Sequence, residues 1–303
     1  MSQRYSFIIL SYNRPQETIE AVDNVINFLD TPEGCFKEIV IVNNNSSVDY
    51  TVCEQYLKDN LSSEVHKIVY IKNSENSGVA GGRNIAMKKS TGDIIISLDD
   101  DAEFREKNLI QYTKQLFDQH ENDNVAIIGY NIVNLDGSIV VSSKRKDKLA
   151  EQEFFTSYFA GGAHALKKCL LDDIGYYQKG ELYGAEEYDL SYRALDNGYQ
   201  ILHCSNLSIL HKKSLNGRLN KAEETGMLLK NKCLLAYKYL TKKHYYSHLF
   251  FWSLFFIKNG SFNLVKLFHY IKMTQKEIRT VTPTPIKTET INYIKSIGGR
   301  LNY

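Results

Sequence analysis

Three consecutive carboxylates, Asp99, Asp100 and Asp101, follow the apolar segment IIISL at residues 94–98. Adjacent carboxylates repel one another, and burying them without partners is costly. A divalent cation would remove that cost, and such cations usually accompany phosphate chemistry. The alternative is a polar strand end in which an aspartate caps the next helix. The segment points first to a metal or phosphate site.

A glycine-rich segment, NSGVAGGRN at residues 76–84, is the second candidate for phosphate binding. Its glycines would let the backbone approach a ligand closely, and Arg83 offers several hydrogen-bond donors. The segment lacks the patterns GxGxxG and GxxxxGK[ST], which disfavours a dinucleotide-binding fold and a P-loop.

A third candidate is GAEEYDLSYR at residues 184–193, where Glu186, Glu187 and Asp189 begin a predicted helix. Carboxylates at this position can simply complement the helix dipole. The functional alternative is that one of them acts as a general base on a hydroxyl group. His211 follows a short predicted strand, and near a carboxylate-bound metal it would serve as a further ligand, although a lone histidine is more often structural.

The elements that must position these residues alternate between strands and helices. Apolar runs predict strands at residues 5–10, 38–42, 67–71 and 94–98, with helices at 15–29, 52–61 and 83–89. This repetition is typical of a doubly wound sheet, in which ligands bind beyond the carboxyl ends of the strands. Polar clusters follow the four strands at residues 11–14, 43–47, 73–83 and 99–101.

The second half of the chain is less regular. Segments 125–133 and 138–142 flank the turn sequence NLDG and predict a hairpin. Helices are predicted at 167–173, 187–197 and 223–240, and short strands at 201–204 and 207–210. Residues 245–257 are aromatic and apolar, but the uninterrupted run LFFWSLFFI is too short to span a bilayer. The polar tail after residue 281 is expected to be loosely held.

Composition narrows the class of protein. At 303 residues the chain can hold one large α/β domain with an appendage, and its net charge of +2 gives no case for nucleic acid. Five scattered cysteines without a CxxC pair argue against disulfides and zinc. Since the apolar core of the N-terminus is short for a signal peptide, a cytoplasmic location is expected.

Five motifs occur together in order: SYNRP, VNNNSS, NSGVAGGRN, SLDDDAEF and GAEEYDLSYRALDNGYQI with the later His211. In this combination the chain resembles the family-2 glycosyltransferases of the GT-A fold. The resemblance implies an α/β fold with a Rossmann-like, mostly parallel central sheet, flanking helices and a C-terminal helical appendage. The implied domains are a catalytic domain at 1–220, an aromatic-rich helical region at 221–280 and a tail at 281–303. Within the catalytic domain, residues 1–103 would bind the nucleotide sugar and residues 104–220 would form the acceptor side.

The resemblance further implies a nucleotide-diphosphate sugar donor (a UDP-sugar first), a divalent Mn or Mg ion and inversion at the anomeric carbon. Asp99, Asp101 and His211 would hold the cation, and Asp99 could instead face the ribose. The residues placed around the donor are Ser11, Tyr12, Asn13, Arg14, Asn43, Asn45, Ser46, Asn76, Gly82, Arg83, Asp99 and Asp100.

Two departures from the family pattern concern the base and the nucleotide. Glu187 stands where the family has aspartate, so it is the first candidate for the catalytic base, with Glu186 second. Asn43 stands where an aspartate commonly accepts from uracil, and its carbonyl oxygen could still accept. The resemblance places Gly161, Gly162 and Asp189 on the acceptor side.

Several alternatives remain open at this point. A nucleotidyltransferase would carry a glycine-rich basic loop after the first strand, where this chain has SYNRP. A non-catalytic nucleotide-sugar-binding scaffold is the other alternative. The acceptor is a saccharide or a lipid-linked saccharide. The C-terminal helices either pack on the catalytic domain or a second copy, or rest on the inner face of a membrane through residues 249–257 and the flanking Lys242, Lys243, Lys258 and Lys266.

Overall fold

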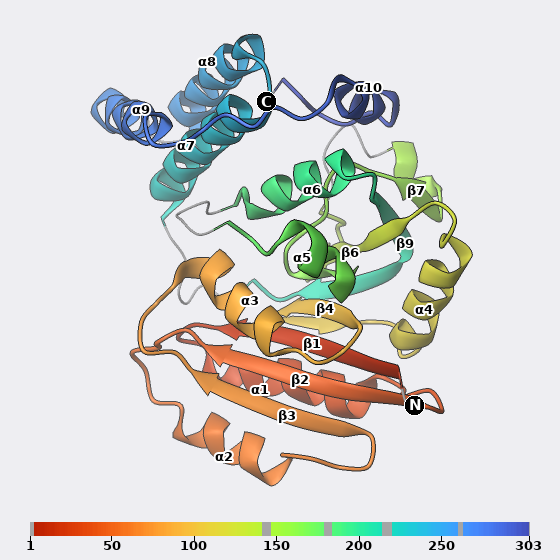
Figure 1. Cartoon of the computed structure of the whole chain (residues 1–303). Coiled ribbons are helices and arrows are strands. Elements are labelled where there is room, and N and C mark those ends of the chain that lie inside the picture. Colours follow the sequence, from red (N-terminus) through yellow and green to blue (C-terminus); the bar gives the residue numbers. More distant parts are fainter. Residues whose placement is uncertain (1–2, 141–146, 179–183, 214–219, 260–262, 303) are drawn as a thin grey trace. The chain divides into compact units, whose positions relative to one another are not determined.

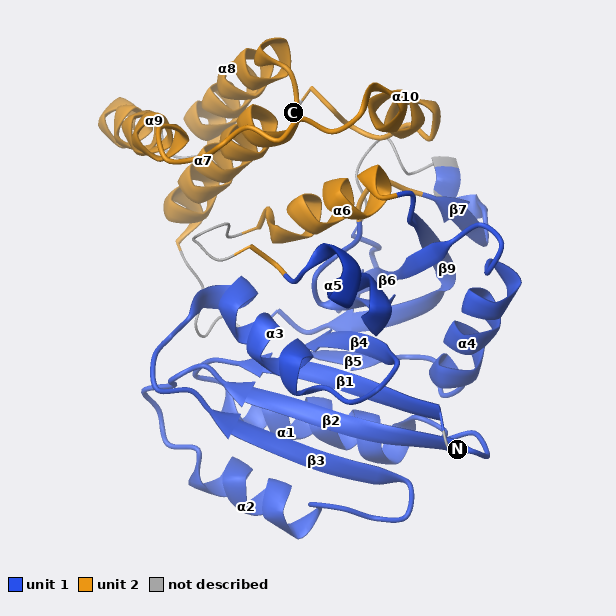
Figure 2. Cartoon of the chain, in the orientation of Figure 1, with its two compact units in different colours: residues 1–155, 159–176, 198–217 blue, residues 156–158, 177–197, 218–303 orange. Residues whose placement is uncertain are grey.

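A computed structural model describes residues 3–140, 147–178, 184–213, 220–259 and 263–302. Figure 1 shows a mixed α/β fold. The chain divides into two compact units, which Figure 2 distinguishes by colour. Unit 1 comprises Met1–Phe155, Phe159–Tyr176 and Gly198–Gly217, and unit 2 comprises Thr156–Tyr158, Tyr177–Asn197 and Arg218–Tyr303.

Unit 1 is built on one sheet, which has nine strands within the described residues. The strand order is β3-β2-β1-β4-β8-β6-β9-β5, and β7 pairs with β9. The β3, β2, β1 and β4 half is parallel, whereas β8 pairs antiparallel with both β4 and β6. The strands are β1 (Gln3–Ser11), β2 (Cys35–Asn43), β3 (His66–Lys72), β4 (Ile94–Asp99), β5 (Ala102–Phe104), β6 (Val125–Asn134), β7 (Glu153–Phe155), β8 (Ala163–Lys167) and β9 (Gln200–His211).

Helices cover both faces of the parallel half, with α1 on one face and α3 on the other (Figure 1). Because both faces are covered, the strands need apolar side chains on both sides, which explains their unbroken apolar runs. In β1, Phe7 and Ile9 lie in the main core, while Leu10 lies against Gly82 of α3. The helical segments of this unit are α1 (Pro15–Asp23), its π-helical continuation η1 (Asn24–Phe28), α2 (Thr51–Asp59), α3 (Gly78–Lys89), α4 (Leu109–Gln119), the 3-10 turn η3 (Asp147–Ala150) and α5 (Lys168–Ile174).

A buried lysine joins β2 to the end of the first helix. The Lys37 ammonium donates to the main-chain carbonyls of Val25, Ile26 and Leu29. These carbonyls have no partner further along the helix, so the lysine satisfies groups that would otherwise be buried unpaired. Burial lowers the pKa of Lys37 to about 8.

Unit 2 contains α6 (Glu186–Asp196), α7 (Lys221–Tyr239), α8 (Lys242–Asn259), α9 (Leu264–Ile278) and α10 (Thr288–Ser296). Leu229 and Cys233 of α7 form a small core with Phe256 of α8 and Leu267 of α9. Among the described residues, no helix combines the length and apolar character needed to cross a bilayer.

The predicted fold class is confirmed, but several elements differ from prediction. Helix α3 begins at Gly78 instead of Arg83, so the glycine-rich segment lies mostly inside a helix. The expected hairpin is reduced to a turn and one bridge between Val133 and Ile139 in the described part of the segment; residues 141–142 lie outside it. One continuous strand, β9, replaces two short ones because a bulge absorbs the irregularity.

The tail also differs from prediction. It contains α10, which is tied to Asp196 by the main-chain N–H of Lys287 and the Thr290 hydroxyl, both at 2.7 Å. Main-chain bonds from Thr284 and Ile286 to α7 add to this attachment. These contacts attach the described part of the tail to α6 and α7.

Candidate active site

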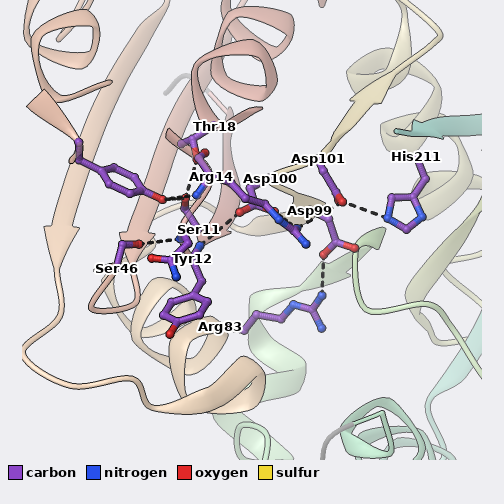
Figure 3. Close-up of polar contacts among 12 residues, drawn as sticks. Ser11, Tyr12, Arg14, Thr18, Ser46, Arg83, Asp99, Asp100, Asp101 and His211 are labelled. Carbon is purple, nitrogen blue, oxygen red and sulfur yellow. Dashed lines mark hydrogen bonds and ion pairs between the residues drawn. The ribbon is translucent and has the colours of Figure 1, made fainter. Parts of the chain in front are cut away.

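Three potential metal ligands meet at the carboxyl end of β4. One ligand atom each from Asp99, Asp101 and His211 lies within 4.8 Å of the others. The pairing of Ala102 in β5 with His211 in β9 brings the histidine to this point, and its Nε2 is 3.2 Å from Asp101 Oδ1. Figure 3 shows His211 facing Asp101. Two carboxylates and an imidazole suit a divalent cation such as Mn²⁺, so these side chains fit the ion that the sequence implied.

Asp100 turns toward the protein instead. It is 4% exposed and accepts from the Arg14 guanidinium at 2.7 Å and from the main-chain N–H of Tyr12 at 3.3 Å. Burial raises the pKa of Asp100 to about 7, although Arg14 opposes this shift. Arg14 is also 3.3 Å from Asp101, and the carboxylates raise its pKa despite burial. Arg14 therefore holds two of the three aspartates in place.

Asp99 is held from a different side. Arg83 of α3 contacts its Oδ1 at 2.8 Å, and Figure 3 shows this contact. Gly162 lies so close that a β-carbon there would come within 2.2 Å of the Asp99 carboxylate. Gly162, which we expected on the acceptor side, therefore contacts the carboxylate cluster itself. Gly161 precedes it in the same turn before β8.

The loops after β1 and β2 are bonded to each other. The main-chain N–H of Asn13 donates to Ser46 Oγ at 2.9 Å, and the N–H of Ser47 donates to Asn13 Oδ1 at 2.8 Å. Asn13 and Asn45 both adopt positive φ, at 59° and 61°, which asparagine tolerates better than most residues. Asn45 is exposed beside them. The asparagine-rich sequence thus serves tight turns at the sheet edge.

Two predicted donor-binding side chains are directed inward. Ser11 is fully buried, and its hydroxyl bonds Thr18 and Tyr50. Asn43 is 1% exposed; it donates to the Tyr70 hydroxyl and accepts from the Ser46 N–H. Its carbonyl oxygen, which we expected to face the base, is thus engaged by the loop.

Asn44, which sequence reasoning passed over, joins the second loop to the third. Its Oδ1 accepts from Asn73 and Ser77, and its Nδ2 donates to Asn76 at 2.9 Å. Asn76 is exposed and also accepts from the N–H of Gly78. The run of three asparagines gave no means of telling which of them turn inward.

Gly82 belongs to the same glycine-rich segment and was expected beside the donor. It lies inside α3, where a β-carbon would come within 2.2 Å of Leu10 Cδ1. The absence of a side chain lets α3 pack closely on β1. The close packing of α3 on β1 places Arg83 beside Asp99. Gly82 itself has a packing role.

In unit 2, the start of α6 buries three carboxylates. Glu186 and Glu187 are 2% and 6% exposed, and Glu186 accepts from the N–H of Ala185 at 2.9 Å. Asp189 is fully buried and bonds Arg193, Lys238 and Tyr239. Asp189, which we expected on the acceptor side, thus joins α6 to α7.

Lys232 of α7 is a further residue that the sequence did not reveal. Its ammonium lies 3.1 Å from the centre of the Tyr188 ring, and Tyr188 directly follows Glu187. Burial lowers the pKa of Lys232 to about 7, while Glu187 and Glu186 raise it. The sequence signal that could have identified Lys232 is a lysine among apolar residues, in the segment LLKNKCLL.

Comparison with known proteins gives consistent results. The sequence model of the family described as glycosyl transferase family 2 matches residues 6–174 of this chain. An uncharacterised glycosyltransferase of Methanocaldococcus jannaschii is 25% identical over 83% of this chain and 84% of its own length.

Two solved structures share the fold. GalNAc-T7 with UDP, GalNAc and Mn²⁺ has a TM-score of 0.61 and 19% identity over 81% of this chain, which spans only 50% of that chain. The mannosyltransferase PcManGT of Pyrobaculum calidifontis, with GDP-Man and Mn²⁺, has a TM-score of 0.59 and 14% identity, covering 98% of this chain and 79% of its own.

Proposed function

The chain belongs to glycosyl transferase family 2 and is a glycosyltransferase, and from that premise we propose how it works. It moves one sugar from a nucleotide-diphosphate sugar, with a UDP-sugar as first expectation, to a hydroxyl group of a saccharide or lipid-linked saccharide. The observation that carries this proposal is the meeting of Asp99, Asp101 and His211 at the carboxyl end of β4. Such strand ends are where α/β sheets bind nucleotides.

Asp99, Asp101 and His211 would hold a divalent Mn or Mg ion. When bound, that ion would neutralise charge on the departing diphosphate. Arg14 and Arg83 keep the carboxylates in position through their contacts with Asp101 and Asp99. The solved neighbours that contain Mn²⁺ support this assignment.

The reaction is a single displacement with inversion. The acceptor oxygen attacks the anomeric carbon, its proton passes to a carboxylate, and the bond from that carbon to the diphosphate breaks. Glu187 is the proposed base and Glu186 the second candidate. Removal of the proton makes the hydroxyl a better nucleophile, which is the usual contribution of a general base.

The loops that follow β1, β2 and β3 are the proposed nucleotide-binding surface. Tyr12, Asn13, Asn45, Ser46 and Asn76 remain candidates there, because each is at least partly exposed. We retain the division into a nucleotide-sugar part at 1–103 and an acceptor part at 104–220 as part of the proposal.

We also propose that the helices of unit 2 contact a membrane surface. Val265, Phe268 and Phe250 are 81%, 67% and 60% exposed. Helix α8 contains lysines at both ends and no acidic residue. Apolar side chains flanked by lysines suit an anionic bilayer surface. Vesicle co-sedimentation tests this contact, and sedimentation without vesicles tests the alternative of a second copy.

The function itself is tested by incubating the full chain with a panel of nucleotide sugars and Mn²⁺. Slow release of a nucleoside diphosphate, accelerated by an acceptor, is expected. Release of pyrophosphate would instead indicate nucleotidyl transfer. Donor binding without hydrolysis or transfer would favour a binding scaffold.

A further inference from the structure

Unit 2 contains a cavity that the proposed reaction leaves without a role. Its volume is about 550 Å³, within the ~300–1,000 Å³ typical of small-molecule sites. Most of its lining is aromatic or aliphatic, including Leu235, Trp252 and Phe255. Lysine, arginine and histidine side chains complete the lining, and none of the described lining residues is acidic. The ligand that suits this composition is apolar over most of its length and negatively charged at one point.

The apolar part of the cavity opens on α8. Phe251, Leu254 and Phe255 line the cavity and yet are 43%, 49% and 45% exposed. A hydrocarbon chain lying against them would remove apolar surface from water, at a gain of roughly 25 cal/mol per Å². The chain could enter from this side without unfolding the helix.

The cationic side chains that line the cavity suit a phosphate group. Lys232, Lys258 and Arg300 all line it. The indole N–H of Trp252 is buried and has no hydrogen-bond partner within the described residues. Lysine, arginine and indole N–H groups are donors, and a phosphate offers only acceptors at neutral pH.

The cavity reaches the helix that carries the candidate base. Tyr188 and Tyr192 of α6 line it, and Tyr188 directly follows Glu187. Lys232 lies over the Tyr188 ring, and it interacts electrostatically with Glu186 and Glu187. A ligand in this cavity would therefore contact the helix that carries the proposed base.

We propose that this cavity holds the lipid part of the acceptor, a long apolar chain bearing a phosphate through which the acceptor sugar is attached. The chain lies against Phe251, Leu254 and Phe255, and Lys258 and Arg300 hold the phosphate. This inference rests on the proposed glycosyl transfer, and it selects the lipid-linked class of acceptor over a free saccharide.

Trp252 provides a direct test because it is the only tryptophan in the chain. The full chain is titrated with farnesyl phosphate while the tryptophan emission is recorded. A saturable change in emission is expected, with affinity at least about tenfold higher than for farnesol. Inorganic phosphate should leave the emission unchanged. No change with farnesyl phosphate, or equal affinity for farnesol, would overturn the proposal.

Two exposed positions allow variants that should fold. Leu254→Glu and Lys258→Glu should each weaken farnesyl phosphate binding by about tenfold or more. Val52→Glu and Lys58→Glu on α2, which are exposed and do not line the cavity, are the matched controls and should bind normally. Equal loss in both pairs would show a general surface effect and overturn the cavity assignment.

Two further arms separate the related possibilities. Vesicles of phosphatidylcholine with phosphatidylglycerol should change the Trp252 emission less than farnesyl phosphate does. A change with vesicles as large as the change with farnesyl phosphate would assign the signal to a bilayer contact and overturn the acceptor site. Binding of a nucleoside diphosphate is measured in parallel in the presence of Mn²⁺. If no nucleotide binds, the proposed function is contradicted. If the nucleotide binds but farnesyl phosphate leaves the Trp252 emission unchanged, this inference alone is contradicted.

Discussion

Gly162 leaves room for Asp99: a β-carbon at position 162 would lie 2.2 Å from the Asp99 carboxylate. Non-bonded heavy atoms do not approach so closely, so a side chain there must displace the aspartate. The displaced carboxylate would lose its 2.8 Å contact with Arg83 and its place beside Asp101 and His211. This single glycine links the turn before β8 to the proposed metal site.

Gly162→Ala should therefore weaken Mn²⁺-dependent nucleotide binding by about tenfold or more while the fold persists. The check is calorimetric titration of the variant, with circular dichroism to confirm folding. A double-mutant cycle with Asp99→Ala supplies the control, since the effect of the added methyl should vanish once the carboxylate is gone. Full additivity of the two substitutions would contradict the contact.

Glu187→Gln should preserve nucleotide binding and reduce turnover by roughly 10²–10⁴-fold, because a general base contributes about that much. Steady-state transfer and donor titration measure the two quantities. Glu224→Gln, an exposed carboxylate in the first turn of α7, is a matched control that should turn over normally. A larger loss in Glu186→Gln than in Glu187→Gln would move the base to Glu186.

Asp189→Ala should destabilise the protein by about 3–5 kcal/mol, because it removes a fully buried carboxylate that the partly buried Arg193 and Lys238 share. Denaturant titration measures this free energy of unfolding. Nucleotide binding by the folded fraction should be unchanged. Asp172→Ala, at an exposed aspartate of α5, should alter stability little. A stable Asp189→Ala protein with a raised acceptor KM would restore Asp189 to the acceptor side.

Lys232 should make stability depend on pH between about 7 and 10. Its folded pKa of about 7 lies below the ordinary value of 10.5, so the unfolded chain binds more protons in this window. Stability therefore rises with pH there, by at most about 1.4 kcal/mol per unit, and it levels off below the folded pKa, where both states bind the proton. Denaturant titrations at several pH values should show a shallower rise in Lys232→Met, whereas Lys266→Met should match the natural chain. Parallel slopes for Lys232→Met and the natural chain would contradict the lowered pKa.

Much of the parallel half of the sheet was predictable from the sequence. Strands β1, β2 and β4 are buried on both faces, so they appear as unbroken apolar runs that end in polar loops. The antiparallel strands β7 and β8 were missed because they are short and lie in an aromatic segment without alternation. Helix α3 was predicted to begin too late because glycines usually interrupt helices, whereas Gly82 is required here for packing against Leu10.

The candidate site was predictable where chemistry alone marks a residue. Adjacent aspartates are costly without a cation, which singled out Asp99 and Asp101. The side chains that position them were harder to assign, because a polar residue has the same signature whether it faces a ligand or the protein. Asn43, Asn44 and Asp189 show this: their roles depend on Tyr70, Ser77 and Tyr239, which are distant in the sequence.

Asp101 is proposed to help hold a cation that binds the donor. The most direct measurement is titration of the full chain with UDP and with GDP, each with Mn²⁺ or with EDTA. At least one nucleotide should bind about tenfold or more tightly with Mn²⁺. Asp101→Asn should lose this gain, whereas Asp118→Asn, at an exposed aspartate of α4, should keep it. Nucleotide affinity that does not depend on Mn²⁺, or an undiminished increase of affinity with Mn²⁺ in Asp101→Asn, would contradict this role of Asp101.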